Sequence, residues 1–332
     1  MEPVKYVVYG AGAVGGVIGG LLHQAKRPVT FVARGDHLAA IRETGLRLDS
    51  GAGVLQVVAL ATDTAADVDW TEDTSVILAV KSHQAPQALA DLRRHAPRDI
   101  AVVCATNGIA TEVAALRLFA GVYALCVMLP STHLEPGLVV AKCHPTPGIL
   151  DIGRIPAGTD AVTSHVASDL RGAGFVSEER ADILAWKRRK LLLNVGNGVD
   201  ASFRQGAGAE ELTGRAVAEG ERVLAASGVS VVTADEDRER RADLLRRRED
   251  VPPAGGSTWQ SLERGTGDSE IDYLAGEIVL QGRLHGILTP VCEAIVEATR
   301  ELARCGGAPR SLDADSVIQT LDREPSVQSR PT

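Results

Sequence analysis

The chain has 332 residues, a length typical of two domains. Apolar residues make up 45% of it and charged residues 23%, as in ordinary globular proteins, and the net charge of −8 gives no basic footprint for nucleic acid. The five cysteines are scattered, with no C-x-x-C pair and no histidine at ligand spacing. We therefore expect buried, unreactive thiols, no metal site and a location in the reducing cytoplasm.

An uncharged stretch at residues 6–22 does not predict a membrane segment. It is crowded with glycine, follows Glu2 and shows no small-residue cleavage site. It is also shorter than the ~20 strongly apolar residues that a spanning helix needs. We expect no contact with a membrane.

The same stretch predicts a dinucleotide site. Val4 to Tyr9 is mostly apolar and predicts a buried strand, and residues 14–24 predict a Gly- and Leu-rich helix. Between them lies GAGAVG, a G-x-G-x-x-G pattern in the strand-to-helix context that gives it meaning. The glycines permit the tight turn, the approach of a pyrophosphate and close helix packing, and the helix N-terminus attracts the anion. The predicted cofactor residues here are Gly10, Ala11, Gly12, Ala13, Val14 and Gly15.

The residue after the second predicted strand, PVTFVA at residues 28–33, selects the dinucleotide. An NAD site would place Asp or Glu there to bind the ribose 2′-hydroxyl. This chain places Arg34, whose forked cation suits a 2′-phosphate. We therefore predict NADP(H) as the cofactor, with Arg34 binding the phosphate, while Asp36 keeps NAD open as an alternative.

Polar side chains also follow two later apolar strands. Lys81 and Gln84 come after the strand predicted at 74–80, and Asn107 follows the strand predicted at 100–105. In an open parallel sheet the ligand lies outside the carboxyl ends of the strands, so all three are predicted cofactor contacts. The alternatives are a solvated lysine and a turn asparagine before glycine.

The order of the elements predicts the fold class. Strands and helices alternate as far as residue 172, as in a doubly wound, mostly parallel sheet, and strand patterns nearly vanish after residue 180. We predict an α/β Rossmann domain at residues 1–179, an all-α domain at 180–320 and a disordered tail at 321–332. Long helices are expected at 180–195, 208–227, 235–249, 268–285 and 290–304, of which the charge-rich 235–249 is expected to be solvated.

The first of these helices carries a second cluster of polar residues. Trp186, Lys190, Asn194 and Asn197 have the spacing of a single helix face. The basic run 187–190 would also fit a surface patch, but the apolar residues that follow favour a helix that takes Lys190 into the interior. A third cluster comprises Ser257, after a Pro/Gly loop, and Glu270.

Together these motifs resemble the ketopantoate reductase (2-dehydropantoate 2-reductase) family over roughly residues 4 to 305. The carriers are GAGAVG, ARGDHLAAIRETGLRL, ILAVKSHQ, TNG, W-x-x-x-K-x-x-x-N, Ser257 with Gln260, EIDYLAGEIV and HGILTPV. The resemblance implies an N-terminal Rossmann domain, an all-helical C-terminal domain, an active site in the cleft between them and NADPH as reductant. It implies reduction of a 2-keto acid, 2-dehydropantoate or a close analogue, to the 2-hydroxy acid.

The resemblance also implies roles for single residues. Lys190 matches the family's general acid, which protonates the ketone oxygen, and Glu270 matches the acid that pairs with it. The substrate-binding positions are matched by Asn194 and Ser257. Asn107 and Lys81 match positions near the nicotinamide, where Asn107 is also a candidate for substrate binding.

The chain departs from the family pattern at Gly198, where an asparagine is expected; Asn197, one residue earlier, is the candidate replacement. The missing side chain suggests a wider pocket and hence a paralogue that acts on another keto acid or an imine. A non-catalytic NADP-binding or sensing protein is the alternative from another class, since fold does not fix function. A homodimer is only the general default among oligomers.

Overall fold

The computed structural model describes residues 4–252, 255–265 and 269–323, and it has two compact units. Unit 1 comprises Met1–Lys190 and Val231–Pro252, and unit 2 comprises Leu191–Ser230 and Pro253–Thr332. The single boundary predicted near Arg180 does not coincide with this division. The chain passes from unit 1 to unit 2 inside helix α6 (Ile183–Val195) and later returns to unit 1 for one segment.

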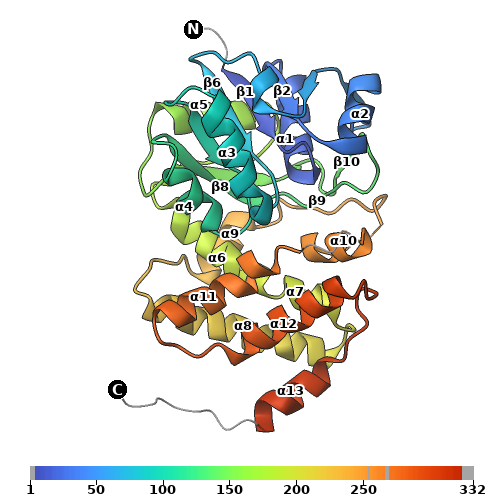
Figure 1. The fold of residues 1–332 in the computed structure, drawn as a ribbon, viewed down its shortest axis with the longest axis vertical. Helices are drawn as coiled ribbons and strands as arrows, with labels where there is room; N and C mark the ends of the chain where they lie inside the picture. The colour runs from blue at the N-terminus through green and yellow to red at the C-terminus, as the bar shows by residue number, and fades with distance from the viewer. Residues whose placement is uncertain (1–3, 253–254, 266–268, 324–332) are drawn as a thin grey trace. The chain divides into compact units, whose positions relative to one another are not determined.

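A seven-stranded sheet forms the centre of unit 1, in the order β11-β8-β7-β6-β1-β2-β5 (Figure 1). All neighbours pair in parallel except β11 and β8, so the predicted doubly wound, mostly parallel sheet is confirmed. The strands are β1 (Lys5–Tyr9), β2 (Val29–Val32), β5 (Leu60–Thr62), β6 (Thr74–Leu78), β7 (Ala101–Cys104), β8 (Val122–Met128) and β11 (Ile149–Arg154).

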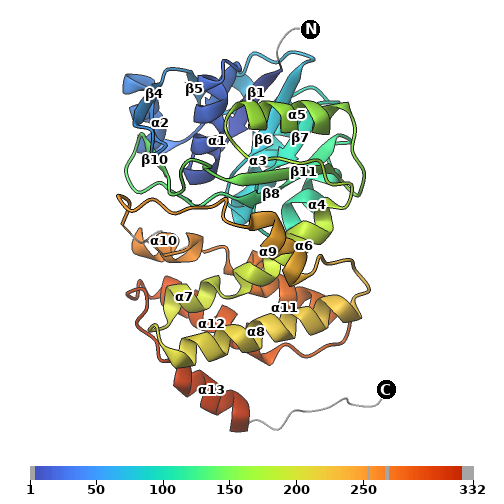
Figure 2. The same cartoon turned by 180° about the vertical axis from the view of Figure 1, so that it is seen from behind.

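Helices cover both faces of this sheet, which explains why its strands are apolar without alternation. Along β1, Val8 faces the core that α1 (Ala13–Gln24) and α5 (Ala161–Gly172) complete, and Val7 faces the core of α3 (Ala85–His95) and α4 (Ala110–Leu116). Figure 1 shows α3 and α4 in front of the sheet, and Figure 2 shows α5 on the other face. Helix α2 (Gly35–Thr44) follows β2.

A smaller sheet, in the order β4-β3-β10-β9, packs on the far side of α1. Its strands are β3 (Leu46–Asp49), β4 (Val54–Val57), β9 (Ser131–Thr132) and β10 (Leu138–Ala141). The alternation of strands and helices in the sequence does not show that these strands form a separate sheet. Their buried side chains, Leu46, Leu48 and Val139 among them, join the core around α1.

The charge-rich segment after residue 234 is not the solvated helix that its composition predicts. Helix α9 (Ala234–Arg241) ends at Ala242, whose φ is +37°, and the rest of the segment has no helix. Arg240 donates to both carboxylate oxygens of Asp151 on β11, at 2.9 and 2.6 Å, and Arg248 donates to the Ala141 carbonyl at 2.9 Å. These contacts attach residues 231–252 to unit 1.

Unit 2 is all-helical in its described residues, as predicted. Its helices are α7 (Asn197–Ser202), α8 (Ala207–Ala226), α10 (Ser257–Glu263), α11 (Ala275–Leu284), α12 (Pro290–Arg304) and α13 (Ala314–Arg323), with a 3₁₀ turn η3 (Ile271–Tyr273). Helix α8, the long helix of this unit in Figure 2, packs on α11, α12 and α13, and α10 packs on α7. None of the described helices has the length and apolar content to cross a membrane.

Two predicted segments of unit 2 differ in detail from the structure. The helix expected at 268–285 is the short turn η3 followed by α11, and residue 268 lies outside the described residues. Residues 321–323 of the expected tail are the last residues of α13. The remaining tail residues, 324–332, also lie outside the described residues.

Gly198 lies in the core of unit 2 and does not widen a pocket. A Cβ at this position would lie 2.7 Å from Ile271 Cδ1, 2.8 Å from Ile295 Cγ2 and 3.0 Å from Thr299 Oγ1. Neighbouring side chains therefore fill the space that the missing side chain leaves. The expectation that Gly198 enlarges a substrate pocket is wrong, because the position faces packed helices.

Gly198→Ala should therefore lower stability. Overpacking of a filled core costs about 1–3 kcal/mol, so the midpoint of urea unfolding should fall. The matched control is Gly214→Ala in α8, where an added Cβ meets nothing within 4 Å and alanine favours the helix. Unchanged stability of Gly198→Ala, together with an altered substrate range, would restore the pocket explanation.

Candidate active site

The glycine turn between β1 and α1 has the geometry of an anion site. Gly10 has a φ of +102°, and a Cβ there would lie 2.8 Å from the Ala79 carbonyl oxygen at the end of β6. At Gly15 a Cβ would lie 2.1 Å from the Gly10 carbonyl oxygen. Only glycine fits both places, so the turn, α1 and β6 pack without intervening side chains.

Gly12 faces open space at the start of α1. It is the N-cap, no side chain caps the helix, and the first turn holds no acidic residue. A Cβ at Gly12 would meet only His133 Nδ1, at 4.0 Å. The first amide groups of α1 are therefore accessible to an anion beside Gly12, and these residues fit a dinucleotide pyrophosphate.

Arg34 is exposed at the end of β2, where it is the N-cap of α2. Its Nη1 donates to Gln87 Oε1 at 3.2 Å, and its positive charge acts to lower the pKa of the nearby Tyr9 hydroxyl. Tyr9 in turn donates to Asp91 at 2.7 Å; burial, followed by this carboxylate, raises the pKa of Tyr9 to about 12. The Arg34 side chain therefore lies where a group that binds the 2′-phosphate is expected. Asp36 is exposed nearby in the first turn of α2.

The turns after β6 and β7 meet at the same edge of the sheet. Lys81 is half-buried and caps a 3₁₀ turn, η2 (Ser82–Gln84), while Gln84 is exposed. Ser82 Oγ donates to the backbone carbonyl oxygen of Asn107 at 3.4 Å. Because β1, β2, β6 and β7 are parallel, the structure brings the glycine turn, Arg34, Lys81 and Asn107 to one edge.

Lys190 is the last residue of unit 1 and is half-buried on α6. Burial lowers the pKa of its ammonium; the nearby Cys126 and Asp237 oppose this change and Arg241 reinforces it. Lys187 is buried and residues 188–190 are half-buried, so this run is not a fully solvated basic patch. A buried lysine with a lowered pKa is a stronger acid than a solvated one.

The remaining predicted residues belong to unit 2. Asn194 is buried on α6, one helical turn after Lys190, whereas α6 ends at Val195 and Asn197 begins the separate helix α7. The predicted helix face therefore holds for three of its four residues. Asn197 Oδ1 lies 3.6 Å from the position of a Cβ on Gly256.

Ser257 and Glu270 each begin a short element of unit 2. Ser257 starts α10, whose N-cap Gly256 donates its N–H to Asp200 Oδ2 of α7 at 3.1 Å. The Ser257 hydroxyl is buried and has no hydrogen-bond partner among the described residues. Glu270, 4% exposed, precedes η3. Unit 2 thus brings Asn197 and Ser257 close together through the contact of α7 with α10.

Sequence reasoning missed a buried ion pair in unit 1. Lys187 and Glu112 are 3% and 1% exposed, with Nζ and Oε1 2.6 Å apart. It also missed Asp237, which is 1% exposed and ion-paired with Arg241. Both pairs lie in charged or turn-rich segments, whose composition indicates exposed side chains. No signal in the sequence therefore predicts that these charged residues are buried.

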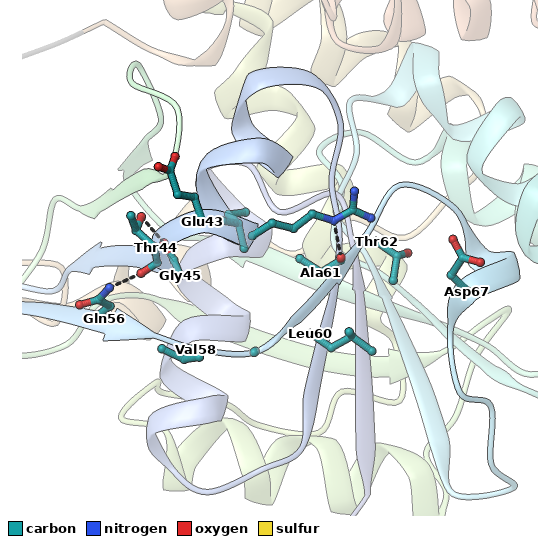
Figure 3. A pocket seen from close by; sticks show the side chains of 12 residues that line it. Glu43, Thr44, Gly45, Gln56, Val58, Leu60, Ala61, Thr62 and Asp67 are labelled. Atoms are coloured by element: carbon teal, nitrogen blue, oxygen red, sulfur yellow. Dashed lines mark hydrogen bonds between the residues drawn. The ribbon is translucent and has the colours of Figure 1, made fainter.

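A surface cavity of about 600 Å³ lies elsewhere in unit 1, between the end of α2 and the β4–β5 segment (Figure 3). Arg42 Nε donates across it to the Ala61 carbonyl oxygen at 3.0 Å, and the exposed side chains of Val58 and Leu60 line its rim. None of the predicted cofactor or substrate residues lines this cavity.

The cysteines and acidic residues offer no metal site in the described part of the chain, where no group of three potential ligands forms. Four cysteines are buried, as expected for small apolar residues, and burial raises the pKa of Cys126 to about 11. Cys305 is exposed, contrary to the expectation, because it caps the end of α12.

Comparisons with known proteins concern the family and the fold of the chain. A family model described as ketopantoate reductase PanE/ApbA matches residues 6–157, and the model of its C-terminal part matches residues 182–303. A 2-dehydropantoate 2-reductase of Halobacterium salinarum is 30% identical over 324 residues, which cover 91% of this chain and 100% of the relative.

Solved structures show the same fold. A PanE/ApbA family ketopantoate reductase from Ralstonia eutropha is 27% identical, with a TM-score of 0.77 over 91% of this chain and 99% of that one. D-Mandelate dehydrogenase in complex with NADH and anilino(oxo)acetate is 22% identical, with a TM-score of 0.78 and the same coverage. The second likeness shows the fold alone.

Gly12→Ala should separate cofactor binding from folding. The added methyl group has room in the protein but would occupy the approach of a pyrophosphate to α1. The variant should keep its thermal midpoint and bind NADPH at least about tenfold more weakly, as measured by quenching of protein fluorescence; this is about 1.4 kcal/mol. The control is Gly172→Ala at the end of α5, where an added Cβ has no neighbour within 4 Å. Unchanged affinity would remove Gly12 from the cofactor site.

Proposed function

Because this chain belongs to the ketopantoate reductase family, we propose that it reduces 2-dehydropantoate, or a close analogue, to the 2-hydroxy acid with NADPH as reductant. Lys190 is the general acid of the proposal. Asn194, Asn197 and Ser257 bind the substrate, and Glu270 pairs with the lysine. The proposed cofactor contacts are Gly10, Ala11, Gly12, Ala13, Val14, Gly15, Arg34, Lys81, Gln84 and Asn107.

The observation that carries this proposal is the partial burial of Lys190, which lowers the pKa of its ammonium. Reduction of a ketone builds negative charge on the carbonyl oxygen, and a positioned ammonium stabilises that charge and supplies the proton. Lysine is a weak acid in water, so a lowered pKa brings it closer to the working pH. A bound nicotinamide would supply the hydride.

The substrate carboxylate and hydroxyl need donors, and unit 2 offers them. The buried hydroxyl of Ser257 can donate to a carboxylate, and the side-chain amides of Asn194 and Asn197 carry both donors and an acceptor. An unsatisfied buried hydroxyl is unfavourable unless a ligand or water pairs with it. These groups support a small polar acid as the substrate.

NADP(H) is favoured over NAD(H) by Arg34, an exposed guanidinium at the position where an NAD site carries a carboxylate. The family is nicotinamide-dependent, and the similar D-mandelate dehydrogenase was solved with NADH. Asp36, exposed two residues later, is the group that would bind an unphosphorylated ribose instead.

Two alternatives remain testable. A paralogue acting on another keto acid or an imine loses its original support, since Gly198 faces the core. A non-catalytic NADP-binding protein would need no buried lysine on α6. Both would fail to oxidise NADPH with ketopantoate, but only the first would do so with another keto acid or imine.

The proposed function is tested with ketopantoate and Lys190→Ala. The natural chain should oxidise NADPH with a kcat/KM of ~10⁴ M⁻¹s⁻¹ or above. Loss of the general acid should lower kcat at least ~10²-fold, with little change in NADPH affinity. Because the protonated amine is required, kcat/KM of the natural chain should fall as the pH rises through the lowered pKa of Lys190, below its ordinary 10.5. Unchanged turnover in Lys190→Ala would remove this residue from the mechanism.

Arg34→Ala tests the choice of cofactor. Removal of the guanidinium should weaken NADPH binding about tenfold or more, because charge-assisted hydrogen bonds to the 2′-phosphate are lost. NADH affinity should change less than about twofold. The comparison of the two dissociation constants by fluorescence titration decides the point, and an equal loss for both cofactors would mean that Arg34 does not bind the 2′-phosphate.

A further inference from the structure

Lys187 is a buried cation that contacts three acceptor groups of unit 1. Its Nζ lies 2.6 Å from Glu112 Oε1, and it donates to the backbone carbonyl oxygens of Thr106 at 2.8 Å and Leu125 at 3.3 Å. Two of the three ammonium hydrogens are donated to these carbonyl oxygens, and Glu112 Oε1 forms an ion pair without hydrogen-bond geometry. The protein itself therefore holds this ammonium through one carboxylate and two backbone carbonyl groups.

The acceptors come from three different elements of unit 1. Thr106 follows β7 and directly precedes Asn107, Leu125 lies within β8, and Glu112 lies in the first turn of α4. One ammonium therefore joins α6 to two neighbouring strands and to the helix that follows the Asn107 turn. Lys190 follows three residues later on α6, a rise of about 4.5 Å.

A buried ion pair is not an efficient way to stabilise a fold. Desolvation of both charges offsets most of their attraction, and apolar residues of similar volume often stabilise a protein as well or better. Both carboxylate oxygens of Glu112 are buried and neither accepts a hydrogen bond in the described residues, so the carboxylate is held by charge alone. What the pair provides that apolar packing does not is a fixed direction, because three acceptors specify where the ammonium must lie.

We propose that the Lys187–Glu112 pair is a positioning device for the reaction, which rests on the proposed function of Lys190. It holds α6 in one register against the carboxyl edge of the sheet, so that Lys190 keeps its place relative to the Asn107 turn. Lys187 and Glu112 are thus positioning residues that act through Lys190 and Asn107. A misplacement of catalytic groups by about 1 Å can cost ~10²-fold in rate.

The decisive variant replaces both charges with apolar residues, Lys187→Met together with Glu112→Met. Lys187→Met alone leaves a buried, uncompensated carboxylate and should lower the Tm strongly. The double variant should recover the Tm to within about 3 °C of the natural chain, since no unpaired charge remains. Its kcat should stay at least about tenfold lower, while its NADPH dissociation constant changes less than about threefold.

The matched control breaks another ion pair of unit 1 at the opposite edge of the sheet. Asp169 of α5 accepts from Arg27 at 2.7 Å and from the Tyr6 hydroxyl at 2.7 Å. Asp169→Asn should lower the Tm and leave kcat unchanged. A double Met variant with the Tm and kcat of the natural chain would overturn the proposal, because the pair would then be only structural.

Glu112→Asp keeps the proposal falsifiable if the double Met variant does not fold. This change retains both charges, shortens one side chain by a methylene and should lower kcat more than it changes NADPH affinity. An unchanged kcat would overturn the proposal. The same change is then made in the Lys190→Ala background, where its effect on kcat should shrink to less than about twofold, because residues that act through one group are not additive. An undiminished effect would overturn the coupling to Lys190, whereas full activity of Lys190→Ala alone would overturn the proposed function instead.

Discussion

The parallel pairing of β2, β1, β6 and β7 is the constraint on which every proposed cofactor contact depends. Tyr9 pairs with Val32 on one side and with Leu78 on the other, so three strands end at the same level. The residues that follow them are the glycine turn, Arg34 and Lys81, and the next strand adds Asn107. The close approach of Gly10 to Ala79 then leaves no room for a side chain between turn and sheet.

Buried charged side chains are a second feature of unit 1. Lys187 with Glu112, Asp237 with Arg241, and Asp151 with Arg240 are all ion pairs with at least one almost fully buried partner. The first pair joins helix α6 to α4, and the third joins the segment 231–252 to strand β11 of the sheet. The pKa of Lys190 on α6 depends on Asp237 and Arg241 as well as on its own burial.

The sequence predicts the elements better than it predicts their packing. Periodicity and the glycine motif predict β1, α1, β2, β6 and β7, because local pattern and burial agree there. Periodicity could not show that β3, β4, β9 and β10 form a second sheet, since register depends on distant residues. The prediction of a solvated helix over the charge run at 235–250 is wrong for a related reason. Composition cannot show that Arg240 and Arg248 bind a buried carboxylate and a carbonyl group.

Within the proposed site, the sequence indicates which residues are candidates, but it does not show which groups surround them. Helical spacing predicts that Lys190 and Asn194 lie on one face of α6. The break between α6 and α7 at Gly196 separates Asn197 from that face. The sequence predicts that the missing side chain of Gly198 widens the pocket. The positions of Ile271 and Ile295 show that neighbouring side chains fill this space. The sequence does not indicate that Lys187 is buried, because a lysine beside two arginines is typical of a solvent-exposed segment.

Chemical rescue of Lys190→Ala by small amines tests the central claim most directly, namely that an ammonium at this place protonates the substrate oxygen. Methylamine, ethylamine and less basic amines of similar size are added in turn, and the rate of NADPH oxidation with ketopantoate is measured for each. The account predicts saturable recovery by the protonated amines, with rates that depend on the amine pKa as general acid catalysis requires. Absence of recovery with every amine, or recovery that does not depend on the amine pKa, would contradict it.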